Sequence, residues 1–234
     1  MDDVPSVALP ALLGRQKASW DALVEIGPEL GEHWVLVGGQ MVYLHEVEHG
    51  ARDIRPTVDV DVVVDLRVEP GALRRVNAVL TGAGFEQDPP APDGIAHRYR
   101  RGDATIDVLA PDNLGPRTSL SLGLGRTIQA TGATQAIARS SVVRAELTDG
   151  GAVEVRRPTL LGKIAAVTEI VSQSPAERAK HLLDVDALAR LMGPADRADA
   201  TLTKHERRSL RKLLATDHLS PLAEAALNLL AGGS

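Results

Sequence analysis

The sequence predicts an α/β protein of the α+β kind, with a small mixed sheet in its first two-thirds and helices in the rest. Segments 58–64 and 104–110 alternate their side chains with the two-residue period of a strand. Helical periodicity separates them, and from Pro158 onward it is the only pattern. We therefore predict a sheet domain at 1–157 and a helical domain at 158–234. The 234 residues suffice for one large domain or two small ones that share a core.

The first predicted elements surround a pair of glycines, Gly38-Gly39. Trp20 and Leu23 lie on the apolar face of a helix predicted at 17–30, and Gly27-Pro28 indicates that this helix ends early or restarts. The diglycine follows an apolar strand and precedes an amphipathic helix. In chain order, the elements around it are a strand at 35–37, a helix at 40–49 and a strand at 58–64.

The later elements follow from the same patterns. Arg101-Gly102-Asp103 and Asp149-Gly150-Gly151 are typical of hairpin turns. The segment 111–125 is rich in Gly, Pro and Ser, and we interpret it as a long loop over the site, either a lid or an acceptor surface. The remaining predictions are a helix at 69–83, a loop at 87–94, strands at 95–100 and 104–110, a helix at 134–138, strands at 142–147 and 153–156, and helices at 160–172, 175–192, 204–216 and 221–230.

Composition limits the class of protein. The net charge of −5 argues against indiscriminate nucleic-acid binding, although a local basic patch could still steer a polyanion. The absence of cysteine excludes disulfides and thiol-ligated zinc. No window reaches the roughly 18 uninterrupted apolar residues of a membrane span, and we expect a cytoplasmic protein without a membrane partner. Aromatic residues form only 2% of the chain, too few for a base-stacking platform.

Two acids on one strand suggest a metal site. Asp59 and Asp61 alternate with valines, so both should project from the same face of the strand. Neighbouring carboxylates repel each other unless a cation lies between them. Mg²⁺, or Mn²⁺ in its place, is commonly held by one or two carboxylates together with substrate phosphates. The alternative is an edge strand with a solvated polar face, which we would favour for a bare D-x-D.

The diglycine suggests a phosphate site beside these acids. Glycines between a strand and a helix let backbone amides approach a phosphate closely, at the positive end of the helix dipole. Gly38 and Gly39 alone would also fit an ordinary turn. Arg55 and Thr57, which precede the acids, complete a larger pattern.

That pattern is a strand, Gly-Gly, a helix, and Arg-x-Thr-x-Asp-x-Asp on a second strand. It resembles the nucleotidyltransferase superfamily with the DNA polymerase beta type of palm, and within it the AbiEii/MenT group of toxins. The resemblance covers roughly residues 34–191, although its specific motifs occupy only a small fraction of them. It implies transfer of a nucleotide from a nucleoside triphosphate, with Asp107 as a third metal ligand that helps to deprotonate the attacking hydroxyl. The alternative for Asp107 is a satisfied strand residue near a hairpin turn.

The resemblance also implies roles for residues outside the diglycine and the acids. Lys163 would contact the nucleotide phosphates and Asp184 would be the late acidic residue, with Asp186 as its rival. Lys163 could otherwise be a solvent-facing helix residue. Gln40 stands where many relatives have a small hydroxyl residue, and we expect an amide contact to phosphate from it. Lys180-His181 replaces the usual Lys-Asp pair. The complete nucleotide-binding set is Gly38, Gly39, Gln40, Thr57, Lys163, Arg178 and Lys180.

By the same resemblance, the expected acceptor is the 3′ end of tRNA, in a toxin opposed by a partner antitoxin. Other acceptors remain open, namely an antibiotic hydroxyl or a Ser, Thr or Tyr of a partner protein. A nucleotide-binding module that has lost turnover is a further alternative. Two basic groups could contact RNA, although a charge run is more often a solvated face. They are Arg98, Arg100 and Arg101, and the segment Lys204, His205, Arg207, Arg208, Arg211 and Lys212. We interpret the seven histidines as lacking an H-E-x-x-H or other zinc spacing, and His181 and His205 as surface residues.

Overall fold

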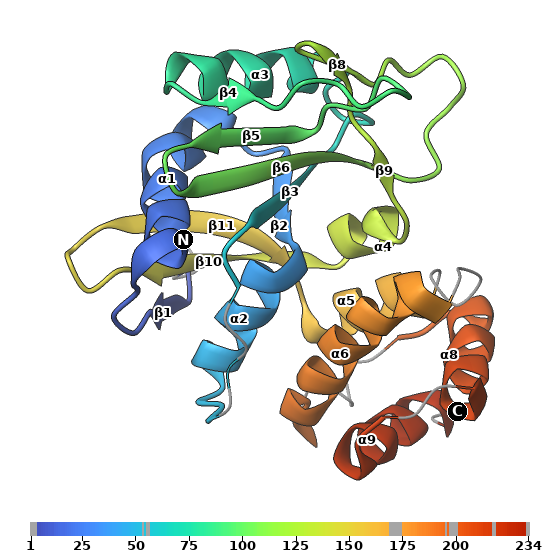
Figure 1. Ribbon diagram of the computed structural model, residues 1–234. Helices are drawn as coiled ribbons and strands as arrows, with labels where there is room; N and C mark the ends of the chain where they lie inside the picture. Colours follow the sequence, from blue (N-terminus) through green and yellow to red (C-terminus); the bar gives the residue numbers. More distant parts are fainter. Residues whose placement is uncertain are drawn as a thin grey trace.

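The computed structural model describes residues 4–52, 54, 57–168, 175–194, 196, 201–216 and 219–232. Within them the chain is a mixed α and β protein whose strands all precede residue 159 (Figure 1). The central sheet has the order β2-β3-β6-β5-β4, and β9 also pairs with β6. Its strands are β2 Trp34–Val37, β3 Val60–Val64, β4 Glu86–Gln87, β5 Arg98–Arg101, β6 Ala104–Pro111 and β9 Gln129–Ala130.

The central sheet is mixed because β3 and β6 run parallel, while β2 and β5 run antiparallel to them. Valines and other aliphatic side chains on these strands are almost fully buried, as expected where both faces of a sheet are covered. The helices that precede the last hairpin are α1 Gly14–Leu30, α2 Gly38–Glu48, α3 Ala72–Gly82 and α4 Ala133–Ala138.

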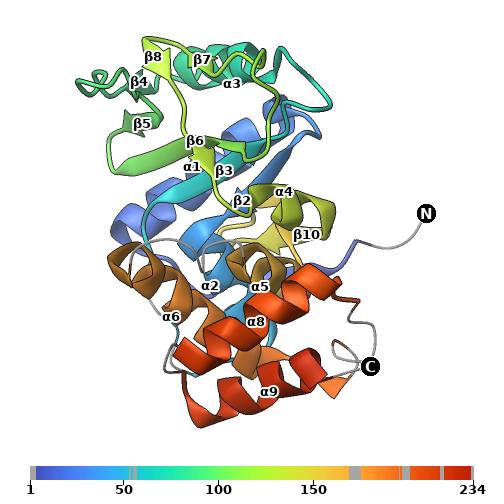
Figure 2. The same ribbon diagram turned by 90° about the vertical axis from the view of Figure 1, so that its right-hand side faces the viewer.

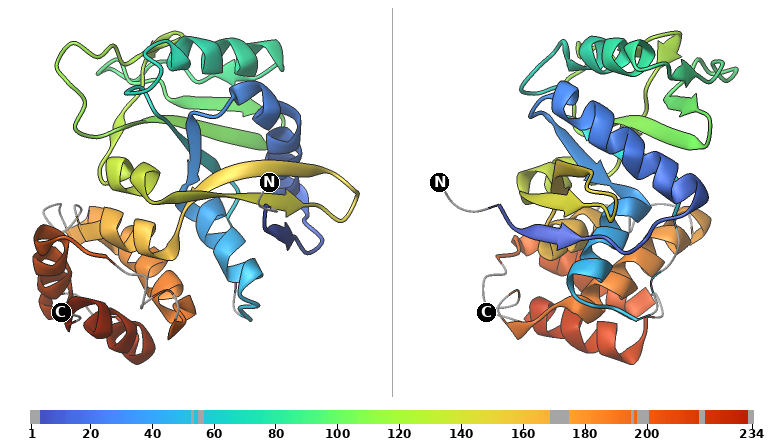
Figure 3. Two further views of the ribbon diagram at one scale, coloured as in Figure 1. Left: turned by 180° about the vertical axis from the view of Figure 1, so that it is seen from behind. Right: turned by 90° about the vertical axis from the view of Figure 1, so that its left-hand side faces the viewer.

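A second, smaller sheet packs against α1 and β2. It has the order β1-β10-β11 and contains β1 Ser6–Ala8, β10 Ser140–Glu146 and β11 Ala152–Pro158. Figure 3 shows the β10-β11 hairpin lying across α1. The hairpin was predicted, whereas β1, which pairs parallel with β10, was not. Three residues carry too short a pattern for a strand to be predicted from them.

The early end predicted for the first helix at Gly27-Pro28 is wrong, because α1 continues through Pro28 to Leu30. Pro28 has no amide to donate to the Val24 carbonyl, but it lies in the last turn, so only two helical residues follow the lost hydrogen bond. Gly27 is needed for close packing. A Cβ at this position would lie 2.6 Å from the Cγ2 atom of Val153 on β11.

The interpretation of residues 111–125 as a lid over the site is also wrong. The segment contains β7 Ser121–Leu122, which pairs with β8 Gly125–Arg126 beside α3. Leu122 is fully buried there, and its carbonyl accepts a hydrogen bond from the Gln87 amide at 2.9 Å. The hairpin therefore extends the α3 edge of the molecule, at the opposite end from the last helices (Figure 2).

After β11, the regular elements that the structure describes are all helices. These helices gather at one end of the molecule (Figure 1), and α6 packs against α2 and α9. None of the helices in the described residues has the length and apolar content needed to cross a membrane. They are α5 Leu160–Thr168, α6 Pro175–Leu191, α8 Lys204–Thr216 and α9 Pro221–Gly232.

Candidate functional site

A row of polar side chains crosses three neighbouring strands of the central sheet. Asp61 on β3 is the register partner of Asp107 on β6, and Asp107 is the register partner of Arg98 on β5. Residues directly opposite each other on paired strands point to the same face, and neighbouring strands lie about 4.8 Å apart. The two acids that the sequence places 46 positions apart are therefore adjacent on one face of the sheet.

Arg98 links two of the three predicted metal ligands. Its Nε and Nη2 atoms donate to both carboxylate oxygens of Asp107, at 2.7 and 2.6 Å. Its Nη2 atom also lies 3.7 Å from Oδ2 of Asp59, which immediately precedes β3. The pKa of Arg98 is raised, first by the hydrogen bonds to Asp107. A cation thus already occupies the position between two carboxylates, and this arrangement was not predicted.

The diglycine lies directly against the acid strand. Gly38 begins α2 with a φ of +66°, and a Cβ there would lie 1.9 Å from Oδ2 of Asp61. A Cβ on Gly39 would lie 2.3 Å from Oγ1 of Thr57. Any larger residue at either position would displace these side chains. The residues of the sequence pattern therefore form one compact unit, in which Asp61 and Thr57 contact the N-terminus of α2.

Gln40 does not have the role that we expected. Its side chain is fully buried, its Oε1 atom accepts from Nε1 of Trp20 at 2.8 Å, and its Nε2 atom donates to the Thr57 carbonyl at 3.0 Å. Both ends of the amide are used inside the protein and the side chain is fully buried, so Gln40 does not present its amide to a phosphate in this structure. Gln40 instead ties α1 to the residue that packs on Gly39.

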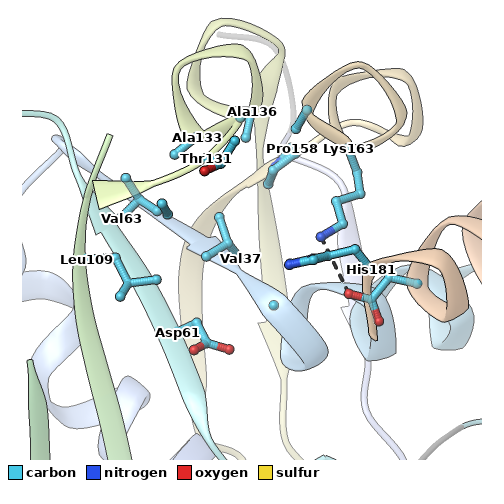
Figure 4. Close-up of a pocket in the computed structure, with 15 residues that line it drawn as sticks. Val37, Asp61, Val63, Leu109, Thr131, Ala133, Ala136, Pro158, Lys163 and His181 are labelled. Atoms are coloured by element: carbon cyan, nitrogen blue, oxygen red, sulfur yellow. Dashed lines mark ion pairs between the residues drawn. The ribbon is translucent and has the colours of Figure 1, made fainter. Parts of the chain in front are cut away.

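Lys163 and Asp184 approach the acid strand from the helical part. Lys163 on α5 and Asp184 on α6 form a buried ion pair, with 3.4 Å between Nζ and Oδ2. Both line a cavity of about 140 Å³ together with Gly38 and Asp61. In Figure 4, Lys163 and His181 enter this cavity from the side opposite Asp61. The cavity is smaller than a typical ligand pocket of roughly 300–1,000 Å³, so it can enclose only part of a nucleotide.

Asp184 and its rival Asp186 have different surroundings. The Oδ1 atom of Asp186 accepts from the Ser220 backbone amide at 2.6 Å, and its Oδ2 atom lies 3.2 Å from Nε of Arg190. Asp186 therefore holds the start of α9, whereas Asp184 lines the cavity. His181, interpreted from the sequence as a surface residue, is half-buried and lines the cavity as well.

Three predicted residues cannot be located in this site. Arg55 lies outside the described residues. Arg178 and Lys180 belong to α6, but their side chains are outside the described part of the chain.

The first basic group predicted for RNA is largely neutralised within the protein. Arg98 pairs with Asp107, as described above. Arg100 pairs with Asp88 at 3.0 Å, and Arg101 pairs with Glu25 at 2.6 Å. On α8 the exposed basic side chains are Lys204, His205, Arg208, Arg211 and Lys212. Of the two groups, α8 therefore has more positive charge facing solvent.

The donor set suits a hard divalent cation. Asp59, Asp61 and Asp107 offer only carboxylate oxygens, which Mg²⁺ and Mn²⁺ prefer. The guanidinium held between Asp59 and Asp107 shows that this position attracts positive charge. In this structure the carboxylate oxygens of the three acids do not all lie within 4.8 Å of one another. For all three to bind one ion, their side chains must move closer together, and Arg98, which donates to both oxygens of Asp107, must shift with them.

A second polar cluster lies at the other end of α2 and was assigned no role from the sequence. One ring nitrogen each of His45 and His49 and one carboxylate oxygen of Glu48 lie within 4.8 Å of one another. Our interpretation that the histidines lack an H-E-x-x-H spacing is wrong, because residues 45–49 have this spacing, and it is the signal that could have identified the cluster.

Comparison with known proteins adds no further identification. No family model matches the chain, and no curated protein or solved structure matches it.

Proposed function

We propose that the protein is a metal-dependent nucleotidyltransferase with a polymerase-beta-like palm. The observation that carries the proposal is the contact between Gly38 and Asp61, with Asp107 in register on the next strand. It joins a helix N-terminus, which favours phosphate, to carboxylates, which favour Mg²⁺. Lys163 adds a positive charge at the cavity that Gly38 and Asp61 line.

The reaction follows from these positions. An acceptor hydroxyl attacks the α-phosphorus of a nucleoside triphosphate, a new P–O bond forms, and the bond to the β-phosphate oxygen breaks to release pyrophosphate. Asp59 and Asp61 would hold Mg²⁺, which when bound would neutralise the negative charge that develops on the phosphates. The backbone amides at Gly38 and Gly39 bind the phosphates, and Lys163 orients them as a point charge. Once Arg98 has moved away from the Asp107 carboxylate, Asp107 accepts the proton of the acceptor hydroxyl.

The ion pair of Lys163 with Asp184 favours a positioned lysine. Both side chains are buried, and a buried ion must be paired to be tolerated. Asp184 holds the Lys163 ammonium at the cavity until a triphosphate provides additional negative charge. The carboxylate is therefore a positioning residue in this proposal.

The acceptor and the biological role are proposed from the resemblance to AbiEii/MenT toxins. We propose the 3′ end of tRNA as acceptor and a neutralising antitoxin as partner. The exposed basic side chains of α8 support a polyanionic acceptor, because they lie on the helical part that also contributes to the cavity. A cytoplasmic location is part of the same proposal.

Incubation with each α-labelled nucleoside triphosphate, Mg²⁺ and total tRNA tests this proposal. Label should move to tRNA with one or a few of the four nucleotides, and EDTA should abolish the transfer. Parallel incubations with a cell lysate and with aminoglycoside antibiotics test protein and antibiotic acceptors. Absence of labelled product with all acceptors and all nucleotides would contradict the nucleotidyltransferase assignment.

The second candidate is a nucleotide-binding module without turnover. The clamp of Arg98 on Asp107 favours it, because both oxygens of this carboxylate already accept hydrogen bonds from a cation. In that case Mg²⁺ with a triphosphate would raise the melting temperature while no product formed. The labelling experiment and a melting experiment on the same sample therefore separate the two candidates.

A further inference from the structure

We propose that His45, Glu48 and His49 form a second metal site, for a transition-metal ion of the Zn²⁺ type, at the C-terminal end of α2. The site is independent of the proposed nucleotidyl transfer. Zn²⁺ is commonly bound by imidazole nitrogens together with a carboxylate, and two histidines four residues apart lie on one face of a helix. Within the described residues, this is the group of histidines and acids whose ligand atoms come close enough to one another to share an ion.

The hydrogen bonds of both histidines leave a ring nitrogen available as a ligand. Nε2 of His45 lies 2.9 Å from the Pro158 carbonyl oxygen, which can only accept, so Nε2 carries the proton. The Nδ1 atom of the neutral ring then has a lone pair, and it is buried without a hydrogen-bond partner. Nδ1 of His49 donates in the same way to the His45 carbonyl at 2.9 Å, which leaves the lone pair on Nε2 of His49. Because Nδ1 is the nitrogen that lies 3.8 Å from Oε2 of Glu48, the His49 ring must turn to present Nε2 to the ion. A backbone carbonyl that orients a ligating histidine is the usual outer partner in zinc sites.

The Arg157 guanidinium pairs with one Glu48 oxygen, and a carboxylate has enough lone pairs to bind an ion as well. The guanidinium also opposes a second cation, which makes the expected affinity lower than that of a closed structural zinc site.

The geometry requires a small rearrangement. Ligand atoms around tetrahedral Zn²⁺ at about 2.0–2.1 Å are roughly 3.4 Å apart, compared with separations of up to 4.8 Å here. Glu48 and His49 are 29% and 32% exposed, so both can turn toward the ion. Water would complete the coordination from the solvent side.

This site is separate from the carboxylate site. Eleven helical steps of about 1.5 Å put His49 roughly 16 Å from Gly38, and α2 leads away from β3 (Figure 1). The C-terminal end of a helix also favours cations. Glu46, which follows His45 in the H-E-x-x-H pattern, is only 4% exposed and cannot reach a substrate in solvent. We therefore assign metal binding and no hydrolytic activity.

Bound metal would connect α2 to the end of β11 through His45 and Pro158. Pro158 also lines the cavity, and α5 begins two residues later, at Leu160. The metal would thus fix the point at which the helical part leaves the sheets.

Calorimetric titration of the metal-free full chain with Zn²⁺ in excess Mg²⁺ tests the proposal, because Mg²⁺ occupies oxygen-only sites. We expect one Zn²⁺ per chain. His49→Gln should weaken binding by at least about 10- to 100-fold, since loss of an outer partner alone has that effect. Substituted Co²⁺ should give visible absorption bands, and this substitution should change them.

Two variants serve as controls. His205→Gln changes an exposed histidine on α8, and Asp61→Asn changes the carboxylate site; both should bind Zn²⁺ like the wild type. The proposal is overturned if the wild type does not bind Zn²⁺ in excess Mg²⁺, if His49→Gln binds it equally well, or if Asp61→Asn abolishes binding. Melting curves without metal establish that each variant is folded.

Discussion

The two ends of helix α2 resemble each other in backbone and differ in surroundings. Each end has a glycine in the left-handed region, Gly38 at +66° and Gly50 at +64°. A Cβ at Gly38 would collide with the Asp61 carboxylate, whereas a Cβ at Gly50 would meet nothing within 4 Å. Gly50 serves only the chain reversal, in which its amide donates to the Val47 carbonyl at 3.0 Å. Gly38 serves both the turn and the close approach of an acid.

This difference in surroundings distinguishes a glycine that serves the proposed site, Gly38, from one that serves only the backbone, Gly50. At the C-terminal end the charges are compensated locally, since Glu48 pairs with Arg157. At the N-terminal end Asp61 approaches the helix start so closely that no side chain fits between them. The proposed ligand groups of the two ends also differ, with oxygens alone at one and nitrogens plus one oxygen at the other. Four predictions test this contrast.

The largest effect is expected from Asp61→Asn. An amide has a similar shape but no charge, so metal and triphosphate would no longer be held together. Nucleotidyl transfer should fall by about 10³-fold while the melting temperature without metal changes little. Asp103→Asn, in the exposed turn between β5 and β6, is the control and should retain full activity. Transfer of α-label to the acceptor is the measurement, and an active Asp61→Asn protein would exclude the proposed role.

The next effect distinguishes the two glycines directly. Gly50→Ala adds only left-handed strain and should lower the free energy of unfolding by about 1–2 kcal/mol without changing activity. Gly38→Ala adds the same strain and also displaces Asp61, so it should cost about 2–4 kcal/mol and reduce transfer by about 10²-fold. Denaturant unfolding and label transfer measure the two quantities. Equal losses of activity in both variants would remove the functional distinction between the ends.

The sequence predicted most of the elements because their patterns are long. The alternating strand at Asp59 and Asp61, the hairpins, and the helices after Pro158 all have several periods of side-chain pattern, and they are observed within a few residues. The strands missed were β1 and the short β4, β7, β8 and β9, each of two or three residues. The helix end predicted at Gly27-Pro28 is wrong because the rule that Gly-Pro ends a helix considers only the local sequence. The burial of α1 against the rest of the protein outweighs that local preference.

The candidate site was predictable where its residues are close in sequence. Gly38, Gly39 and Asp61 belong to one strand-helix-strand unit, so their proximity follows from chain order. The Arg98 clamp depends on the pairing of β5 with β6, and the use of Gln40 depends on Trp20 in α1. Neither partner can be chosen from periodicity, because periodicity fixes the face of an element and not its neighbour. The histidine cluster is a different case, since its spacing was present in the sequence.

A third prediction concerns the cation at the N-terminal end. Arg98→Gln leaves Asp107, which is only 5% exposed, without its bidentate partner. In EDTA the free energy of unfolding should fall by about 1–3 kcal/mol. Added Mg²⁺ should then raise the melting temperature more than in the wild type, because the guanidinium no longer competes for the acids. Arg100→Gln on the same strand breaks an exposed pair and should lower the free energy of unfolding by less than about 1 kcal/mol. The effect of Mg²⁺ on its melting temperature should match that of the wild type. An equal response to Mg²⁺ in all three proteins would show that Arg98 does not occupy the metal position.

The smallest effect is the acid sensitivity of the C-terminal end. Glu48 has a pKa of about 2 in the folded protein, below the ordinary value of 4.5, so the unfolded chain takes up its proton first as the pH falls. Stability from this group is present above pH 4.5 and is lost between pH 4.5 and about 2. With allowance for partial exposure, the loss is about 2 kcal/mol.

Glu48→Gln should flatten the dependence of unfolding free energy on pH in that window, measured in EDTA, even though its absolute stability is lower. Glu86→Gln, an exposed acid on β4, should leave the slope unchanged. Burial lowers the pKa of His45, so this histidine contributes a separate loss that begins as the pH falls below about 6.5 and remains in Glu48→Gln. If Glu48→Gln keeps the wild-type slope below pH 4.5, the contacts of Glu48 with His45 and Arg157 do not stabilise this end of α2. The contrast between the two ends of the helix would then rest on the glycines alone.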